Sequence, residues 1–153
     1  MRRHLWLVLF LFAPLLASAQ DLAKIVTKAD VEKASGQKFK DGWTPSTGSL
    51  MFQQPAGDLQ VGVDVEKPDA GSTVRSWEAT MKKVQPGSKV ETIKGIGTDA
   101  IVYSTRSDSA AVLADFANPR VQMRVSVVGA KDVAQARQIV VDLAKTIGPR
   151  VGK

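Results

Sequence analysis

Two stretches of the chain carry apolar side chains at every second position. Residues 59–65 do so with leucine and valine, and residues 121–127 do so with valine and methionine. Strict alternation predicts strands of a sheet that has one buried face and one face in contact with water. Each stretch follows a short apolar segment and a turn, so each predicts the second strand of a hairpin. The predicted strands and turns are, in chain order, 50–52, a turn at 55–58, 59–65, 100–104, 111–117, a turn at 118–119, and 121–127.

Three other segments have the features of helices. In the middle one, apolar residues recur at helical spacing and include Trp77, which predicts that this tryptophan is in the core. Asp132 and Gln135 form a capping box for the last helix, and Thr27 can cap the first. The predicted helices begin after Thr27, at Ser72 and after Asp132, and they end at Gly36, before Pro86 and at Gly148.

The order of hairpin and helix occurs twice. A shift of 62 residues places residues 59–65 on 121–127 and the middle helix on the last one. This order predicts an α+β fold, with a single antiparallel sheet, two long helices on one face and a short N-terminal helix. Either a ββα unit is duplicated, or the match is a coincidence of the kind that unrelated α+β segments show. In the duplicated register, Asp64 and Arg124 are close enough for a cross-strand ion pair.

The beginning of the chain has the three parts of a secretory signal peptide. Arg2 and Arg3 precede an apolar stretch at residues 5–16, and small residues follow at 17–19. We therefore expect a signal peptide at residues 1–19, cleaved after Ala19, and one domain at residues 20–153. The alternative is a retained anchor, but the apolar stretch is shorter than the roughly 20 residues that span a bilayer. The expected location is the periplasm or the exterior, with no membrane span after cleavage.

Several of these features together resemble small exported bacterial domains of unknown function, including actinobacterial lipoprotein families. The segments that carry the resemblance are residues 27–36, 50–65, 95–100 (Gly-Ile-Gly-Thr-Asp-Ala) and 133–147. The chain departs from those families because it has no lipobox cysteine. The resemblance implies a compact α+β fold and supplies no catalytic residue.

The composition excludes several kinds of chemistry. The chain has no cysteine, and its one histidine, His4, lies in the predicted signal peptide. Disulfides, thiolate nucleophiles, Ser-His-Asp triads and the usual zinc sites are therefore excluded from residues 20–153. The formal net charge is +6, but basic and acidic residues are interspersed along the chain, so no nucleic-acid surface is expected. We expect no cofactor and no metal, and we predict that the protein is not an enzyme.

Asp64 and Glu66 share one strand face and could form a pair of catalytic carboxylates. Such a pair acts in glycoside hydrolysis when its two environments differ. The alternation of this strand places both carboxylates on the face in contact with water. A solvated or ion-paired surface is therefore the preferred interpretation, and a carboxylate-dependent hydrolase is the alternative.

The polar sheet face and one loop tryptophan are the predicted binding surface. Trp43 lies beside glycine and proline residues, where it either closes the end of the core or is presented to a partner. The predicted function is that of a binding or accessory domain that contacts an unknown envelope protein. The alternative is a carrier that holds a small amphiphile between sheet and helices, with Met51, Met81, Met123 and Phe52 lining the cavity. The candidate partner-binding residues are Trp43, Gln60, Asp64, Gln122 and Arg124.

Overall fold

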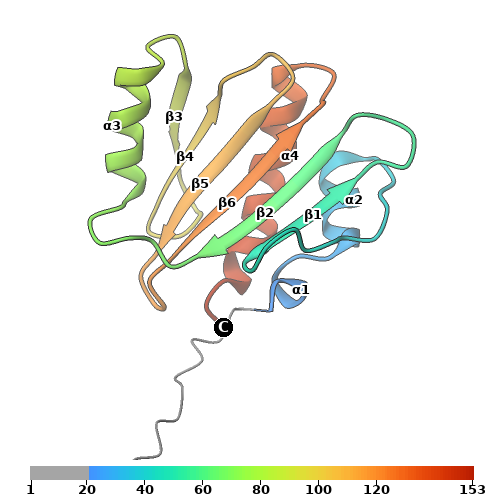
Figure 1. Ribbon diagram of the computed structural model, residues 1–153, viewed down its shortest axis with the longest axis horizontal. Coiled ribbons are helices and arrows are strands. Elements are labelled where there is room, and N and C mark those ends of the chain that lie inside the picture. The colour runs from blue at the N-terminus through green and yellow to red at the C-terminus, as the bar shows by residue number, and fades with distance from the viewer. Residues whose placement is uncertain (1–20) are drawn as a thin grey trace, which may run out of the picture.

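The computed structural model describes residues 21–153, and it confirms the predicted α+β fold. One six-stranded antiparallel sheet has the strand order β1-β2-β6-β5-β4-β3 (Figure 1). The predicted signal peptide, residues 1–19, lies outside the described residues. The elements are α1 (Leu22–Ile25), α2 (Lys28–Ser35), β1 (Ser49–Gln53), β2 (Gln60–Glu66), α3 (Val74–Val84), β3 (Lys89–Ile93), β4 (Asp99–Ser104), β5 (Ala110–Phe116), β6 (Val121–Val128), α4 (Val133–Ile147) and the 3₁₀ turn η1 (Gly148–Arg150).

The two strands with strict alternation, β2 and β6, pair with each other in the middle of the sheet. Val63 lies opposite Val125, and Asp64 lies opposite Arg124. The valines face the buried side, and the charged residues face the other side. The cross-strand pair of Asp64 and Arg124 that the duplicated register predicts is therefore confirmed.

Strand β3 was not predicted from the sequence. It pairs with β4 at the end of the sheet, and only two of its five residues, Val90 and Ile93, are apolar. Its charged residues, Lys89 and Glu91, suit an edge strand, because charges there discourage pairing with another chain. Because so few of its residues are apolar, the strand has no hydrophobic periodicity that would predict it from the sequence.

Helix α4 covers one face of the sheet and forms the main core. Figure 1 shows α4 behind β4, β5 and β6, and α2 beside it behind β1 and β2. The stripe of α4 that faces the sheet is fully buried: Ala136, Ile139, Val140, Leu143, Ala144 and Ile147. It packs on the alternate residues of the strands, including Val63, Val112 and Val125, none of which is exposed.

Helix α3 does not lie on this face, so the prediction of two long helices on one face is wrong. Val74 of α3 packs with Ile101 of β4 and Leu113 of β5, and both of those residues point away from α4. The reason is that α2 packs against α4 and occupies the place beside it. The opposite face of β4 and β5 is also apolar, so α3 packs there through Val74, which is buried, and Trp77, which is half-buried, while Val84 at its end stays exposed.

This arrangement limits the predicted duplication to the hairpins. The 62-residue shift places β1 on β5 and β2 on β6, and the four strands are arranged symmetrically as β1-β2-β6-β5. The helices that follow the two hairpins pack on opposite faces of the sheet. A complete ββα repeat is therefore not present.

An ion pair joins the first helices to the end of the chain. The guanidinium of Arg150 contacts both carboxylate oxygens of Asp30, at 2.6 and 3.0 Å, and it also donates to the carbonyl of Ile25. The hydrogen bonds from Arg150, helped by those of Thr27 in the capping box of α2, lower the pKa of Asp30 to about 2.

None of the helices in the described part of the chain, residues 21–153, has the length and the apolar composition that a membrane span requires.

Candidate functional site

The face of the sheet opposite α4 is only partly covered. Helix α3 packs over β4 and β5, and no helix among residues 21–153 covers the same face of β1, β2 and β6. The uncovered part carries polar side chains because these strands alternate. Their side chains on this face are Ser49, Met51 and Gln53 of β1, Gln60, Asp64 and Glu66 of β2, and Gln122, Arg124, Ser126 and Val128 of β6.

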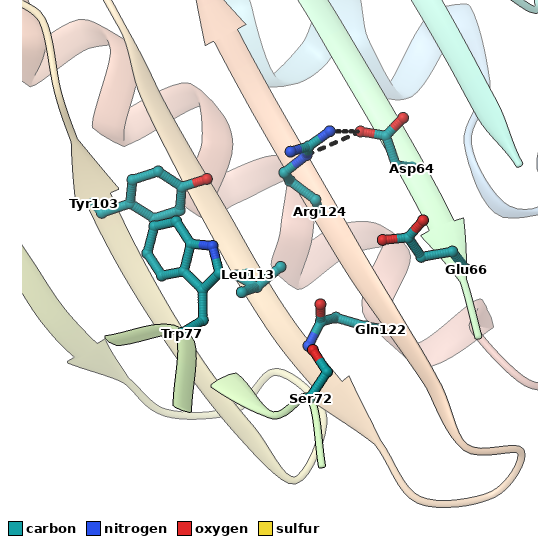
Figure 2. A pocket seen from close by; sticks show the side chains of 8 residues that line it. All are labelled: Asp64, Glu66, Ser72, Trp77, Tyr103, Leu113, Gln122 and Arg124. Carbon is teal, nitrogen blue, oxygen red and sulfur yellow. Dashed lines mark hydrogen bonds and ion pairs between the residues drawn. The ribbon is translucent and has the colours of Figure 1, made fainter. Parts of the chain in front are cut away.

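A pocket lies where the covered and uncovered parts meet. Its volume is about 220 Å³. Figure 2 shows that two aromatic rings stand on one side and an ion pair on the other, with Gln122 and Ser72 at one end. Its lining consists of Asp64, Glu66, Ser72, Trp77, Tyr103, Leu113, Gln122 and Arg124.

The aromatic side of the pocket is formed by Trp77 of α3 and Tyr103 of β4. Their ring centroids are 4.2 Å apart and the ring planes are tilted by 43°. Both side chains are half-buried, so the prediction that Trp77 belongs to the core is only partly right. Burial raises the pKa of the Tyr103 phenol, and the charge of Asp64 adds to this while Arg124 opposes it. Tyr103 is therefore a neutral phenol at any physiological pH.

The opposite side is the ion pair of Asp64 and Arg124. The Nε and Nη2 atoms of Arg124 lie 3.1 and 3.0 Å from Oδ2 of Asp64, and the hydroxyl of Ser49 donates to Oδ1. Burial opposes the charge on Arg124, but Asp64 outweighs it, with help from Tyr103 and Glu66, so the pKa of Arg124 is raised. Asp64 is thus engaged at both oxygens by residues of the neighbouring strands.

Asp115 of β5 fixes α3 to the sheet beside the pocket. One of its oxygens accepts a hydrogen bond from the backbone N–H of Val74, at the start of α3, and the other accepts from the side chain of Gln122, both at 2.8 Å. Arg75 adds an ion pair with Asp99 of β4. The position of Trp77 over Tyr103 therefore depends on polar contacts as well as on the small apolar cluster.

A second hollow, of about 170 Å³, lies on the other side of Tyr103. It continues along β5 and β6 past Ala111 and Ser126 to Val128. Its floor includes the small side chains of Ala111 and Ser126, so the surface of the sheet is recessed there. The two hollows share Tyr103 as a lining residue, so they are neighbours on this face of the sheet.

The structure brings together three of the five predicted binding residues. Asp64, Gln122 and Arg124 line the pocket. Gln60 lies opposite Val128 at the far end of β2. Gln122 was expected in contact with water, but it is buried beside the start of α3 and bonded to Asp115.

Trp43 lies at the outer edge of the sheet, away from the pocket. Its backbone pairs with Met51 of β1 in an isolated bridge, through hydrogen bonds of 2.9 and 3.0 Å. Its side chain is 43% exposed. This exposure does not fit a residue that closes the end of the core, and presentation to a partner stays a prediction. Residues that pair directly in an antiparallel bridge point to the same face, so Trp43 belongs to the uncovered face of the sheet.

The aromatic side of the pocket does not follow from the alternation of the polar face. The helical spacing predicts Trp77 in the core, and the polar face as predicted does not include Tyr103. One pattern could have revealed them: Ala100, Ile101 and Val102 are apolar in succession, as are residues 110–114. Continuous apolar runs indicate strands buried on both faces, and so predict a helix on each side of the sheet.

The side chains expected to line a carrier cavity do not lie together. Met123 and Phe52 are buried on the α4 face, whereas Met51 lies on the opposite face and Met81 belongs to α3. Between α4 and the sheet, Ile139, Leu143 and Ile147 are fully buried, which leaves no water-sized space around them. Among the described residues, no group of three or more acidic or histidine side chains is arranged to hold a metal.

Comparison of the chain with known protein families, with curated proteins and with solved structures finds no match.

Proposed function

We propose that this protein is exported and acts in the cell envelope as a non-catalytic binding domain. Its binding surface is the uncovered face of the sheet, with the pocket between α3 and β6 at its centre. The observation that carries the proposal is the half-covered sheet. An α+β domain of this size can close both faces of a sheet, yet here polar side chains and a pocket occupy the open part.

The polar contacts within the pocket favour binding over catalysis. Asp64 is held by Arg124 and Ser49, which engage both of its carboxylate oxygens, so neither oxygen is free to act as a nucleophile. Glu66 lies beside it on the same strand, but a catalytic pair needs two carboxylates whose roles differ. The carrier alternative is less favoured because its expected cavity is filled by packed side chains.

Carboxylate footprinting tests the proposed surface. The protein is expressed with its own leader, purified from the exported fraction, and labelled with a carbodiimide and an amine in the presence and absence of its host's envelope fraction. We expect Glu66, which is exposed beside the pocket, to be protected by the envelope fraction. Asp142, on the outer side of α4, is the matched control and should be labelled equally in both samples.

Equal labelling of Glu66 in both samples, or protection of Asp142 alone, would contradict the proposal. The same preparation tests export. We expect the N-terminal residue of the exported protein to be Gln20, as read by N-terminal sequencing. Recovery of the protein in the cytosol alone would contradict the export part of the proposal.

A further inference from the structure

We propose that the pocket between α3 and β6 binds a pyranose ring of a neutral saccharide, packed on Trp77 and hydrogen-bonded by Arg124 and Glu66. This inference rests on the proposed function, and it names the class of ligand. Three features of the pocket carry it: the balance of charges, the mixture of donors and acceptors, and the aromatic wall.

The charges around the pocket disfavour an anion. Arg124 is already neutralised by Asp64 at 3.0 Å, so an anion would have to compete with Asp64 while it faced Glu66. Facing charges of equal sign are unfavourable within a few ångströms, in particular where the pocket walls exclude water. The lining holds two carboxylates and one guanidinium, so a cation would meet Glu66 on one side and Arg124 on the other, whereas a neutral ligand meets no repulsion.

The polar groups of the pocket match hydroxyl groups. A guanidinium has five N–H donors, and those of Arg124 that bond to Asp64 are on Nε and Nη2. Glu66 offers carboxylate acceptors, and Gln122 retains its amide oxygen because its nitrogen donates to Asp115. A saccharide hydroxyl both donates and accepts, so one ring can use both kinds of group at once.

The aromatic wall matches the face of a sugar ring. Trp77 and Tyr103 stand together on one side of the pocket, opposite the polar groups (Figure 2). Figure 2 shows the Tyr103 hydroxyl and the Trp77 indole nitrogen on the side toward the polar groups, so the edges of the two rings face the pocket. The ligand would therefore lie with its apolar C–H groups against the ring carbons and its hydroxyl edge toward β2 and β6.

The volumes of the two hollows indicate that one sugar ring fits the pocket and that a second ring of the same saccharide fits the hollow beyond it. At about 220 Å³, the pocket is smaller than the sites of about 300–1,000 Å³ that hold drug-sized ligands. The second hollow, of about 170 Å³, adjoins it at Tyr103 and is lined by Ser109 and Ser126. A linear saccharide of two or more rings can occupy both hollows.

The test is a titration of the exported, ¹⁵N-labelled protein followed by amide and indole resonances. The probes are N-acetylglucosamine, chitotetraose, cellotetraose and maltotetraose, with glucosamine and glucuronate as the charged counterparts. We expect saturable shifts at Trp77, Tyr103, Gln122 and Arg124 with at least one neutral probe. The tetrasaccharide should bind about tenfold more tightly than a single ring, because it reaches the second hollow.

Three variants connect the shifts to the pocket. Trp77→Leu should weaken binding about tenfold, whereas Val84→Ala, which changes an exposed apolar side chain of the same helix that lines neither hollow, should leave it within about twofold. Glu66→Gln changes an exposed side chain that the fold does not need, and it should weaken binding a few-fold. Saturable shifts that survive both Trp77→Leu and Glu66→Gln would overturn the inference.

The failure of this inference can be distinguished from failure of the proposed function. If glucosamine or glucuronate shifts the resonances of the pocket residues and no neutral probe does, the proposed class of ligand is wrong, but the pocket is still the binding site. The same holds if only a small-molecule extract of the envelope shifts them. If no probe and no small-molecule extract shifts the resonances of any residue of the uncovered face, the inference is overturned. The proposed function is then decided separately by whether the whole envelope fraction protects Glu66 from labelling.

Discussion

Arg124 and Asp64 lie directly opposite each other on β6 and β2, and their side chains form an ion pair with an N–O distance of 3.0 Å. The pair stands on the uncovered face of the sheet and forms one wall of the pocket. It connects the two strands whose alternation is the clearest feature of the sequence. Its partial exposure also determines how much it contributes to stability.

A double-mutant cycle of Asp64→Asn and Arg124→Gln should give a small coupling energy. Arg124 is about half exposed, and pairs of this kind contribute roughly 0.2–1 kcal/mol. The measurement is urea unfolding of the two single variants and the double variant at low salt. The coupling should fall further in 1 M NaCl, because salt screens exposed charges. A coupling above about 2 kcal/mol would mean that the pair is a main support of the fold.

Asp115→Ala should loosen α3 without unfolding the sheet. The change removes the acceptor of two hydrogen bonds, from Val74 and Gln122, and leaving two partly buried donors unpaired costs about 1–3 kcal/mol. Amide hydrogen exchange should speed up in the first turn of α3 and not in α4. Asp142→Ala, which removes a carboxylate bonded to Gln138 on the surface of α4, should change stability by less than about 0.5 kcal/mol. Equal effects of the two substitutions would contradict this role of Asp115.

The two long helices should differ in their contribution to stability. Leu143→Ala removes a fully buried side chain of α4, and such changes cost about 2–5 kcal/mol. Met81→Ala alters the apolar stripe of α3 at a half-buried position, so we expect a cost below about 1.5 kcal/mol. The measurement is the free energy of unfolding from urea titration. A larger effect for Met81→Ala would contradict the assignment of the main core to the α4 face.

The ion pair of Asp30 and Arg150 should make stability depend on pH in acid. The pKa of Asp30 is about 2 in the folded protein and close to its ordinary value of 3.8 in the unfolded chain. The unfolded state therefore binds the proton more readily, and the contribution of Asp30 is complete above pH 4 and is lost as the pH falls through 2. Because Arg150 is partly exposed, we expect a contribution of about 1–2 kcal/mol.

Urea unfolding at a series of pH values from 2 to 6 measures this contribution. Asp30→Asn should reduce the dependence on pH in that range. Asp41→Asn removes the exposed carboxylate that pairs with Lys28, and it should leave most of the dependence in place. An unchanged pH profile for Asp30→Asn would show that other carboxylates are responsible.

The pattern of apolar and polar residues predicted the central strands correctly. It did not predict the edge strand β3 or the face of the sheet on which α3 packs. Alternation predicted β2 and β6, because the period of a strand follows from backbone geometry. The 62-residue register between the two strands predicted the cross-strand pair of Asp64 and Arg124. Strand β3 was missed since an edge strand buries few side chains. For the site, Asp64, Gln122 and Arg124 were found from the polar face, but the aromatic side was not.

What the sequence by itself determined was the type and order of most of the elements, the apolar stripe of α4 and the polar side of β2 and β6. Only the tertiary structure decided that α3 lies on the face opposite α4, that Trp77 stands over Tyr103, and that a pocket opens beside Arg124. The physical reason is that periodicity tells which side of a helix is apolar, whereas the face of the sheet that receives it depends on the space left by the other elements. Here α2 occupies the place beside α4, and the apolar face of β4 and β5 is the surface that remains for α3.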